Sequence, residues 1–379
     1  MEKSKVYFTD MRVGSGDNLP LKLKRLIRTA GIGDIDMADK FVAIKIHFGE
    51  PGNLSFLRPN FAKAVADVVK EHGGKPFLTD CNTLYVGRRK NALDHLDAAA
   101  ENGFSPASTG CQIIIADGLT GRDEVWVPVD GGELVKEAKI GRAIMDADIF
   151  ISLNHFKGHE CTGFGGALKN IGMGCGSRAG KMEQHNGGKT EVDQSKCVGC
   201  RQCAKQCAHG AISFGTKKAF IDKNKCVGCG RCIHACRLEA ISQSADSAND
   251  DLCKKMAEYS KAVVDGRPQF HISIVNQVSP YCDCHPENDA PIIPDVGMFA
   301  SFDPVALDMA CADACNAQPA YANSVLGDNL KHEHRHDGIV DTDADRFTAT
   351  FPTTDWRVTL EHAEKLGVGT REYELITVK

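Results

Sequence analysis

The stretch FVAIKIHF at residues 41–48 decides the fold, because it reads as a β-strand and begins an alternation of strands and helices. An apolar stripe at helical spacing follows over residues 61–69, and Gly73-Gly74 stands where a helix C-cap is expected. The next segment, KPFLTD at residues 75–80, predicts a second strand. A strand, a helix and another strand in this order are typical of a parallel βαβ unit.

The alternation continues to about residue 153. The sequence predicts a helix over about 88–101, a strand over 112–116, a helix over about 134–147 and a strand over 149–153. The run QIIIA at 112–116 is wholly apolar, which favours a strand buried on both faces. Regular periodicity then stops between 155 and 188, where glycine is frequent. The expected fold class is therefore α/β, a mainly parallel sheet with flanking helices.

Similar elements return in the last third of the chain. We expect a helix over about 250–264, a strand over 271–275, a helix that begins at Asp303-Pro304, a helix over about 358–366 and a strand over 373–378. Asp303 suits the N-cap and Pro304 the first helical position. Because such segments flank the cysteine-rich region, we expect residues 1–191 and 245–379 to form one α/β domain, interrupted by an inserted ferredoxin-like module at 192–244.

Composition excludes several functional classes. The formal net charge is −5, from 45 basic and 50 acidic side chains, which gives no field suited to nucleic acid. No apolar run approaches the ~20 residues that cross a bilayer, and the N-terminus has no signal-peptide pattern. We expect a cytoplasmic protein with neither a nucleic-acid nor a membrane partner. Of its 17 cysteines, eight lie within forty residues and the rest are scattered, which indicates metal binding rather than disulfides.

Eight of these cysteines form two copies of one motif, C-x2-C-x2-C-x3-C. Such runs bind [4Fe–4S] clusters in bacterial-type ferredoxins, and the fourth cysteine of each run ligates the other cluster. The predicted ligands of the first cluster are Cys197, Cys200, Cys203 and Cys236, and those of the second are Cys226, Cys229, Cys232 and Cys207. Ala208 and Arg237 stand where the motif usually has proline, which removes no ligand. The alternative is a zinc site or a motif without metal.

The glycine-rich region contains the first candidate site outside this motif. It follows a predicted buried strand, and ligands of open α/β sheets bind beyond the carboxyl ends of strands. Its candidate proton donors and anion partners are His155, Lys157, His159 and Lys169. Three glycines, Gly163, Gly165 and Gly166, permit close backbone approach to a cofactor. The alternative is a polar turn with satisfied histidines.

Two further patches follow. Cys282, Cys284 and His285 lie within four residues and could hold a metal, a third redox centre or a redox-active pair, the alternative being two ordinary thiols in a loop. His332, His334 and His336 alternate with charged residues, which favours a solvated loop over a metal site.

Five segments resemble an uncharacterised iron–sulfur family called domain of unknown function 362. They are KIHFGE at 45–50, TDCNTLY at 79–85, residues 154–170, YCDC at 281–284 and ASFDPVA at 300–306. The resemblance runs nearly end to end and implies a cluster-binding protein. A shorter pattern, His159-x3-Gly-Phe-Gly-Gly-x2-Lys169, is similar to the lactate racemase family, which uses a nickel-pincer cofactor. That similarity implies a general acid/base role for His159, a covalent cofactor on Lys169 and nickel ligation by His185.

These features lead to one principal hypothesis and two alternatives. The principal one is an iron–sulfur oxidoreductase whose two [4Fe–4S] clusters pass single electrons from a ferredoxin-like redox protein to a site near residues 155–185, where a small anionic substrate binds. The first alternative is an electron carrier or complex subunit without its own substrate. The second is a non-redox enzyme with a further metal or organic cofactor, nickel-pincer-like or other.

Overall fold

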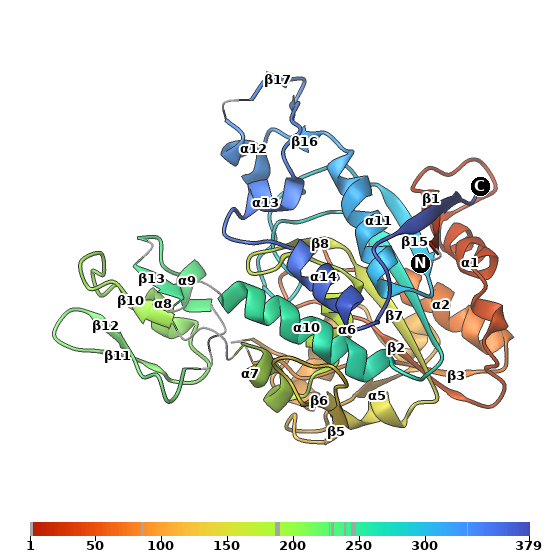
Figure 1. The fold of residues 1–379 in the computed structure, drawn as a ribbon, viewed down its shortest axis with the longest axis horizontal. Helices are drawn as coiled ribbons and strands as arrows, with labels where there is room; N and C mark the ends of the chain where they lie inside the picture. Colours follow the sequence, from red (N-terminus) through yellow and green to blue (C-terminus); the bar gives the residue numbers. More distant parts are fainter. Residues whose placement is uncertain are drawn as a thin grey trace.

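The computed structural model describes residues 3–84, 87–185, 190–226, 228, 231–238, 240–243, 248–331 and 333–379. Its centre is an eight-stranded sheet (Figure 1). From edge to edge the strands are β19 (Tyr373–Thr377), β1 (Ser4–Asp10), β15 (Gly297–Ser301), β14 (Gln269–Val275), β7 (Ile149–His155), β2 (Phe41–Lys45), β3 (Lys75–Asp80) and β4 (Gln112–Ile115). Within this sheet β15 runs antiparallel to β1 and β14, and the other neighbouring pairs are parallel.

Helices cover both faces of the sheet because its strands alternate apolar side chains between the two faces. Val42 and Ile44 of β2 pack in one core, and Ala43 packs in the other. The first core is covered by α1 (Leu19–Thr29), α2 (Pro59–Glu71), α3 (Ala92–Glu101) and α4 (Pro106–Thr109). The second is covered by α5 (Arg142–Asp146), α6 (Ala167–Cys175), α10 (Ala248–Val264), α11 (Pro304–Asn316) and α14 (Arg357–Lys365).

Smaller elements surround this three-layered body. They are β5 (Glu124–Pro128), β6 (Glu137–Gly141), β8 (Lys157–His159), β9 (Gly163–Gly165), α7 (Arg178–His185), β16 (Ala320–Tyr321), α12 (Val325–Asn329), β17 (Arg335–His336), β18 (Ile339–Val340), α13 (Arg346–Thr350) and the 3-10 turn Ile32–Asp34. No helix within the described ranges is both long and apolar enough to span a bilayer.

The cysteine-rich segment forms its own small sheets, to one side of the large one (Figure 1). It contains β10 (Thr190–Val192), α8 (Gln202–Lys205), β11 (Ile212–Phe214), β12 (Ala219–Ile221), α9 (Arg231–His234) and β13 (Ile241–Gln243). β10 pairs with β13 and β11 with β12, both antiparallel. The strands β7 and β14, which precede and follow the segment, are parallel neighbours in the large sheet.

Most predicted elements are present, but two predictions were wrong. Residues 137–141 form β6 rather than part of a helix, because Gly131, at φ +78°, turns the chain so that β6 pairs with β5. The apolar run at 112–116 is an edge strand, with Ile114 exposed, rather than a strand buried on both faces. The region 155–185, where periodicity stops, contains the β8–β9 hairpin, α6 and α7.

Candidate functional site: a cation-lined cavity beside a cysteine-rich segment

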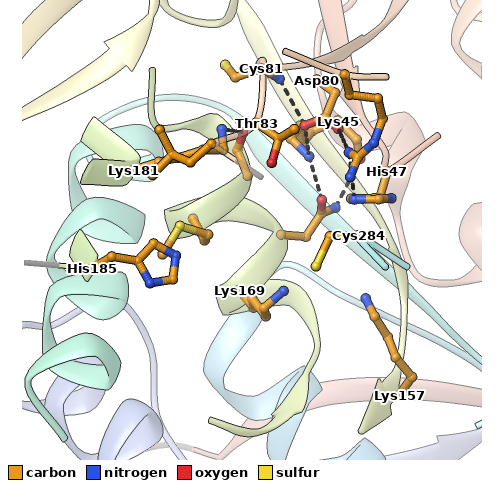
Figure 2. A pocket seen from close by; sticks show the side chains of 15 residues that line it. Lys45, His47, Asp80, Cys81, Thr83, Lys157, Lys169, Lys181, His185 and Cys284 are labelled. Carbon is orange, nitrogen blue, oxygen red and sulfur yellow. Dashed lines mark hydrogen bonds and ion pairs between the residues drawn. The ribbon is translucent and has the colours of Figure 1, made fainter. Parts of the chain in front are cut away.

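A cavity of about 590 Å3 lies where the order of the parallel strands reverses (Figure 2). The chain moves from β2 to β3 to β4 and then returns to β7 on the other side of β2. In open α/β sheets this switch point leaves a crevice at the carboxyl ends of the strands, where ligands bind. The cavity is lined there by Lys45 at the end of β2, Asp80 at the end of β3 and Lys157 just beyond β7.

The cavity is rich in positive charge. Its basic lining residues are Lys45, Arg89, Lys157, Lys169 and Lys181, with His47 and His185. Asp80 is the one carboxylate among the described lining residues. Low-dielectric walls lined by charge of one sign concentrate the opposite charge. The cavity therefore suits an anion.

Lys45 and Asp80 form a buried ion pair at the base of the cavity. Lys45 Nζ lies 2.9 Å from Asp80 Oδ1 and donates to Asn170 Oδ1 at 2.7 Å. Burial alone would raise the pKa of Asp80, but it is outweighed by the combined effect of Lys45, His95, Lys181 and Arg89, and the pKa is lowered. Gly174 makes room for this ammonium, since a Cβ there would lie 2.6 Å from Lys45 Nζ. Within the pair the charges balance, so other lysines supply the excess positive charge.

Lys157, Lys169 and His185, three of the residues predicted from the sequence, line this cavity. Lys157 Nζ donates to the carbonyl of His155 at 3.2 Å, and Lys169 Nζ donates to Cys282 Sγ at 3.1 Å. Figure 2 shows both amines on the side of the cavity where Cys284 lies. Burial lowers the pKa of His185 to about 4. Two cations and one histidine predicted from the sequence therefore line the same cavity.

His155 and His159 have different surroundings. Neither is among the residues that line the cavity. His155 Nδ1 lies 3.0 Å from both carboxylate oxygens of Asp283, and Nε2 lies 2.8 Å from the carbonyl of Asn276. His159 Nδ1 accepts from the Cys161 N–H at 3.1 Å, and burial lowers the pKa of His159 well below its usual range. Both histidines therefore hold the local structure.

The predicted glycines fit their neighbours closely. Gly163 has φ +75°, a left-handed conformation that favours glycine. A Cβ on Gly165 would lie 2.9 Å from Lys169 Cδ, and one on Gly166 would lie 2.2 Å from Asp308 Oδ1. Gly165 and Gly166 therefore allow the side chains of Lys169 and Asp308 to pack directly against the backbone.

Cys282 and Cys284 lie in the loop after β14, and Cys284 lines the cavity. The two thiols are hydrogen-bonded to each other. This hydrogen bond lowers the pKa of Cys284 to about 7, with help from Lys169 and against burial. The same hydrogen bond and burial raise the pKa of Cys282. The pair therefore favours a thiolate on the cysteine that faces the cavity.

Asp283, between the two cysteines, anchors their loop. Its side chain is fully buried against His155, and Lys157 Nζ lies 3.6 Å from Asp283 Oδ2. Burial opposes its charge, but His155 and Lys157 lower the pKa of Asp283. Its carbonyl accepts from the Glu50 N–H at 2.9 Å. The glycine-rich region and the loop of Cys282 and Cys284, both predicted from the sequence as candidate sites, thus meet at the carboxylate of Asp283.

Sequence reasoning missed Lys45, Asp80, Arg89 and Lys181 as members of the site. Lys45 carried a signal, because a lysine inside the apolar strand FVAIKIHF must be paired when it is buried. Lys181 carried none, since its partners are the carbonyls of Gly174 and Gly176.

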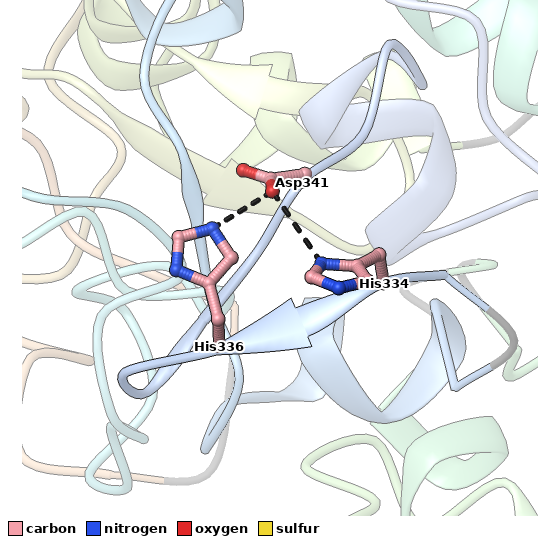
Figure 3. A group of neighbouring side chains, drawn as sticks. All are labelled: His334, His336 and Asp341. Carbon is pink, nitrogen blue, oxygen red and sulfur yellow. Dashed lines mark hydrogen bonds and ion pairs between the residues drawn. The ribbon is translucent and has the colours of Figure 1, made fainter.

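His334, His336 and Asp341 lie together on an exposed hairpin (Figure 3). Asp341 Oδ2 lies 2.8 Å from His336 Nε2 and 3.7 Å from His334 Nδ1. Among the residues that the structure describes, this is the one group of three side chains placed to hold a metal ion. His332 lies outside the described residues. All three side chains are exposed, as expected for a solvated loop.

The predicted cluster cysteines gather around two cavities in the cysteine-rich segment. The first, of about 340 Å3, is lined by Cys197, Cys200, Cys203 and Cys236. The second, of about 330 Å3, is lined by Cys207, Cys226 and Cys232. Cys229 lies outside the described residues. The fourth cysteine of each motif thus faces the cavity formed by the other motif.

Both halves of this segment repeat the same local contacts. The Ala211 N–H donates to Cys207 Sγ and the Ala240 N–H to Cys236 Sγ, each at 3.3 Å. Gly199 and Gly228, each just before the second cysteine of a motif, have φ of +69° and +73°. Backbone N–H groups aimed at sulfur stabilise thiolate ligands. The absence of the usual prolines therefore leaves the turn after each fourth cysteine intact.

One contact joins this segment to the loop of Cys284. Arg231 lines the second cysteine cavity, and its guanidinium contacts His285 Nδ1. His285 Nε2 lies 2.7 Å from Glu160 Oε1, in the turn between β8 and β9. Arg231 adjoins Cys232, and His285 adjoins Cys284. Arg231 and His285 therefore link the two cysteine sites.

The fold and site define an α/β protein with a ligand cavity at the strand switch point and a cysteine-rich segment beside it. The chain belongs to the family described as domain of unknown function (DUF362), whose model matches residues 42–313.

Similarity to individual proteins is partial. The thylakoid-associated protein sll1697 of Synechocystis is 29% identical over 125 residues, which are 33% of this chain and 35% of that protein. The lactate racemase apoprotein of Thermoanaerobacterium thermosaccharolyticum has a TM-score of 0.37 and 10% identity, covering 72% of this chain and 51% of its own. A protein of Thermotoga maritima has a TM-score of 0.39 and 14% identity, covering 78% and 57%. The chain thus spans about a third of the first relative and about half of the two solved chains.

Proposed function

We propose that this protein is an iron–sulfur oxidoreductase. Residues 192–244 form a ferredoxin-like module with two [4Fe–4S] clusters, and these pass single electrons to the cation-lined cavity of the α/β domain. The observation that carries the proposal is the crossed arrangement of cysteines around two separate cavities. Membership of DUF362 is compatible with it but names no reaction.

The donor set suits these clusters. Four thiols surround the first cavity, and the three described thiols of the second leave one place for Cys229. Four cysteines also suit structural zinc. A pair of zinc sites, however, does not require the two motifs to exchange ligands. In two-cluster ferredoxins the fourth cysteine of each motif does bind the cluster of the other motif. When bound, the clusters supply one-electron transfer; the chain supplies thiolates, N–H donors to sulfur and an apolar surround.

The cation-lined cavity of the α/β domain favours an oxidoreductase over a plain electron carrier. A carrier would need no cavity lined by several cations. The contact of Arg231 with His285 brings the second cluster site against the loop that lines this cavity. An external redox protein, ferredoxin-like, would load the clusters, and a small anion would occupy the cavity.

The non-redox alternative assigns a covalent cofactor to Lys169 and nickel to His185. Both residues line the same cavity. The amine of Lys169, however, donates to Cys282 Sγ, and its interaction with the cysteine pair raises the pKa of Lys169 despite its burial. A charged amine of this kind is suited to hold an anion and is a poor nucleophile for a covalent cofactor.

Single cysteine variants test the crossed clusters. We expect Cys207→Ala to change the same cluster signal as Cys226→Ala, and Cys236→Ala the same signal as Cys197→Ala, in electron paramagnetic resonance spectra of the reduced, anaerobically purified protein. Cys253→Ala, a buried thiol of α10 outside both cavities, is the matched control and should keep both signals. If Cys207→Ala resembles Cys197→Ala instead, the crossed assignment is wrong.

A further inference from the structure

The loop of Cys282 and Cys284 touches both the cavity and the cysteine-rich segment. We infer that these two cysteines form a dithiol–disulfide pair through which the clusters reduce a small anionic disulfide bound in the cavity. This inference rests on the proposed function, because the electrons come from the clusters.

The two thiols are arranged for unequal roles. Cys284 lines the cavity, whereas Cys282 is not among the lining residues. Each is hydrogen-bonded to the other, and Lys169 Nζ donates to Cys282 Sγ at 3.1 Å. A dithiol acts on a disulfide through one attacking thiolate and one resolving thiol. Cys284 is placed to attack a bound molecule, and Cys282 is placed behind it to resolve the intermediate.

The surroundings favour a redox pair over a metal centre. Neither cysteine belongs to a group of three metal-ligating side chains in the part of the chain that the structure describes. The neighbouring His285 is turned toward Glu160 and Arg231. Asp283, between the thiols, is directed to His155 and Lys157. Two thiols without a third ligand fit a disulfide better than a metal ion.

The electron count of the clusters matches that of the pair. Reduction of the disulfide takes two electrons and two protons and gives two thiols. Each reduced [4Fe–4S] cluster gives one electron and is oxidised, so two clusters supply both electrons, and solvent supplies the protons. Arg231 adjoins the proposed cluster ligand Cys232 and contacts His285, which is next to Cys284, and so connects the second cluster site to the cysteine pair.

The charge of the cavity selects the substrate class. Lys157, Lys169 and Lys181 face it, and among the described residues no carboxylate lies closer to them than the 3.6 Å that separates Lys157 from Asp283. A disulfide with carboxylate or phosphate groups satisfies these cations. Cys284 thiolate attacks one substrate sulfur and releases the first thiolate. Cys282 then attacks Cys284 Sγ and releases the second thiolate. The Cys282 proton passes to one product, and solvent protonates the other.

Alkylation mapping of the intact holoprotein is the first test. The protein is oxidised anaerobically with 3,3′-dithiodipropionate, a small dianionic disulfide, and is then either alkylated directly or first reduced with photoreduced deazaflavin. We expect Cys282 and Cys284 to be linked and unalkylated in the first sample and both alkylated in the second. In Cys226→Ala, the pair should stay oxidised after the same reduction. If Cys282 and Cys284 are alkylated in both samples of a protein with full iron content, the inference is overturned, but the proposed function still stands.

Substrate charge gives the second test. Cystamine, the dicationic counterpart of dithiodipropionate, differs from it mainly in charge. We expect the reduced holoprotein to consume dithiodipropionate at least tenfold faster, since tenfold corresponds to about 1.4 kcal/mol of differential binding. Cys284→Ser should abolish the reaction, and Cys311→Ala, a buried thiol of α11 outside the cavity, should not change it. Equal rates for both disulfides would overturn the assigned substrate class. Absence of iron would instead refute the proposed function itself.

Discussion

Asp283 connects two parts of the site that are distant in the sequence. His155 is the last residue of the buried strand β7, and Cys282 and Cys284 lie far beyond it in the sequence. The carboxylate between the two cysteines nevertheless lies 3.0 Å from the His155 ring. The histidine predicted to exchange protons with a ligand instead fixes the loop that carries two thiols. A single buried charge thus sets the position of the candidate redox pair.

Lys45 gives a stability prediction with an internal control. Lys45→Met leaves Asp80 buried without its nearest cation, at 2.9 Å, and loss of one partner from a buried pair typically costs about 3–5 kcal/mol. We expect a decrease of about 3 kcal/mol in the free energy of unfolding, measured by denaturant titration under anaerobic conditions.

Lys40→Met is the matched control, because Lys40 pairs with Asp36 at 2.7 Å on the surface. An exposed pair contributes about 0–1 kcal/mol, since water screens it. Equal losses in the two variants would show that burial does not determine the contribution of the Lys45 pair.

At the scale of secondary structure, α6 depends on a carboxylate from another helix. Asp308 of α11 accepts from the Ala167 and Leu168 N–H groups, at 2.6 and 2.9 Å, and so satisfies the first turn of α6. Burial raises the pKa of Asp308 to about 7. Gly166 leaves the space for it. Because α6 carries Lys169, this contact positions an amine of the cavity.

Asp308→Ala should therefore weaken α6 selectively. Loss of an N-terminal cap typically costs about 0.5–2 kcal/mol, and we expect hydrogen exchange of the amides of residues 167–175 to become faster. Asp303→Ala removes a similar cap, on α11, where Asp303 accepts from Val305 and Ala306. Its effect should appear in α11 rather than α6. Unchanged exchange in α6 of Asp308→Ala would contradict this role.

The sequence predicted elements well where one local signal dominates. The helix predicted to begin at Asp303-Pro304 is confirmed. It was predictable because its N-cap and its first-turn proline are adjacent in the sequence. The helix predicted over 134–147 is present only as α5 at Arg142–Asp146, because the chain turns at Gly131-Gly132 and residues 137–141 pair with β5. The edge position of β4 depends on strand order, which no single segment encodes.

At the scale of the whole molecule, the sequence predicted which cysteines of the two motifs lie together but not the assembly of the cavity. The spacing of cysteines within a repeated motif is enough to predict which of them group together. The cavity instead collects Lys45, Asp80, Lys169 and Cys284 from four parts of the chain. Their meeting follows from the return of the chain to β7 beside β2, a long-range pairing that periodicity does not contain.

Metal and sulfide analysis of anaerobically purified native protein, with its intact mass, tests the central claim most directly. Two [4Fe–4S] clusters predict about eight irons and about eight acid-labile sulfides per chain, no stoichiometric zinc or nickel, and an unmodified Lys169. Zinc without sulfide, or no metal at the cysteine motifs, would contradict the account. Nickel, or added mass on Lys169, would replace electron transfer by cofactor chemistry at the cavity.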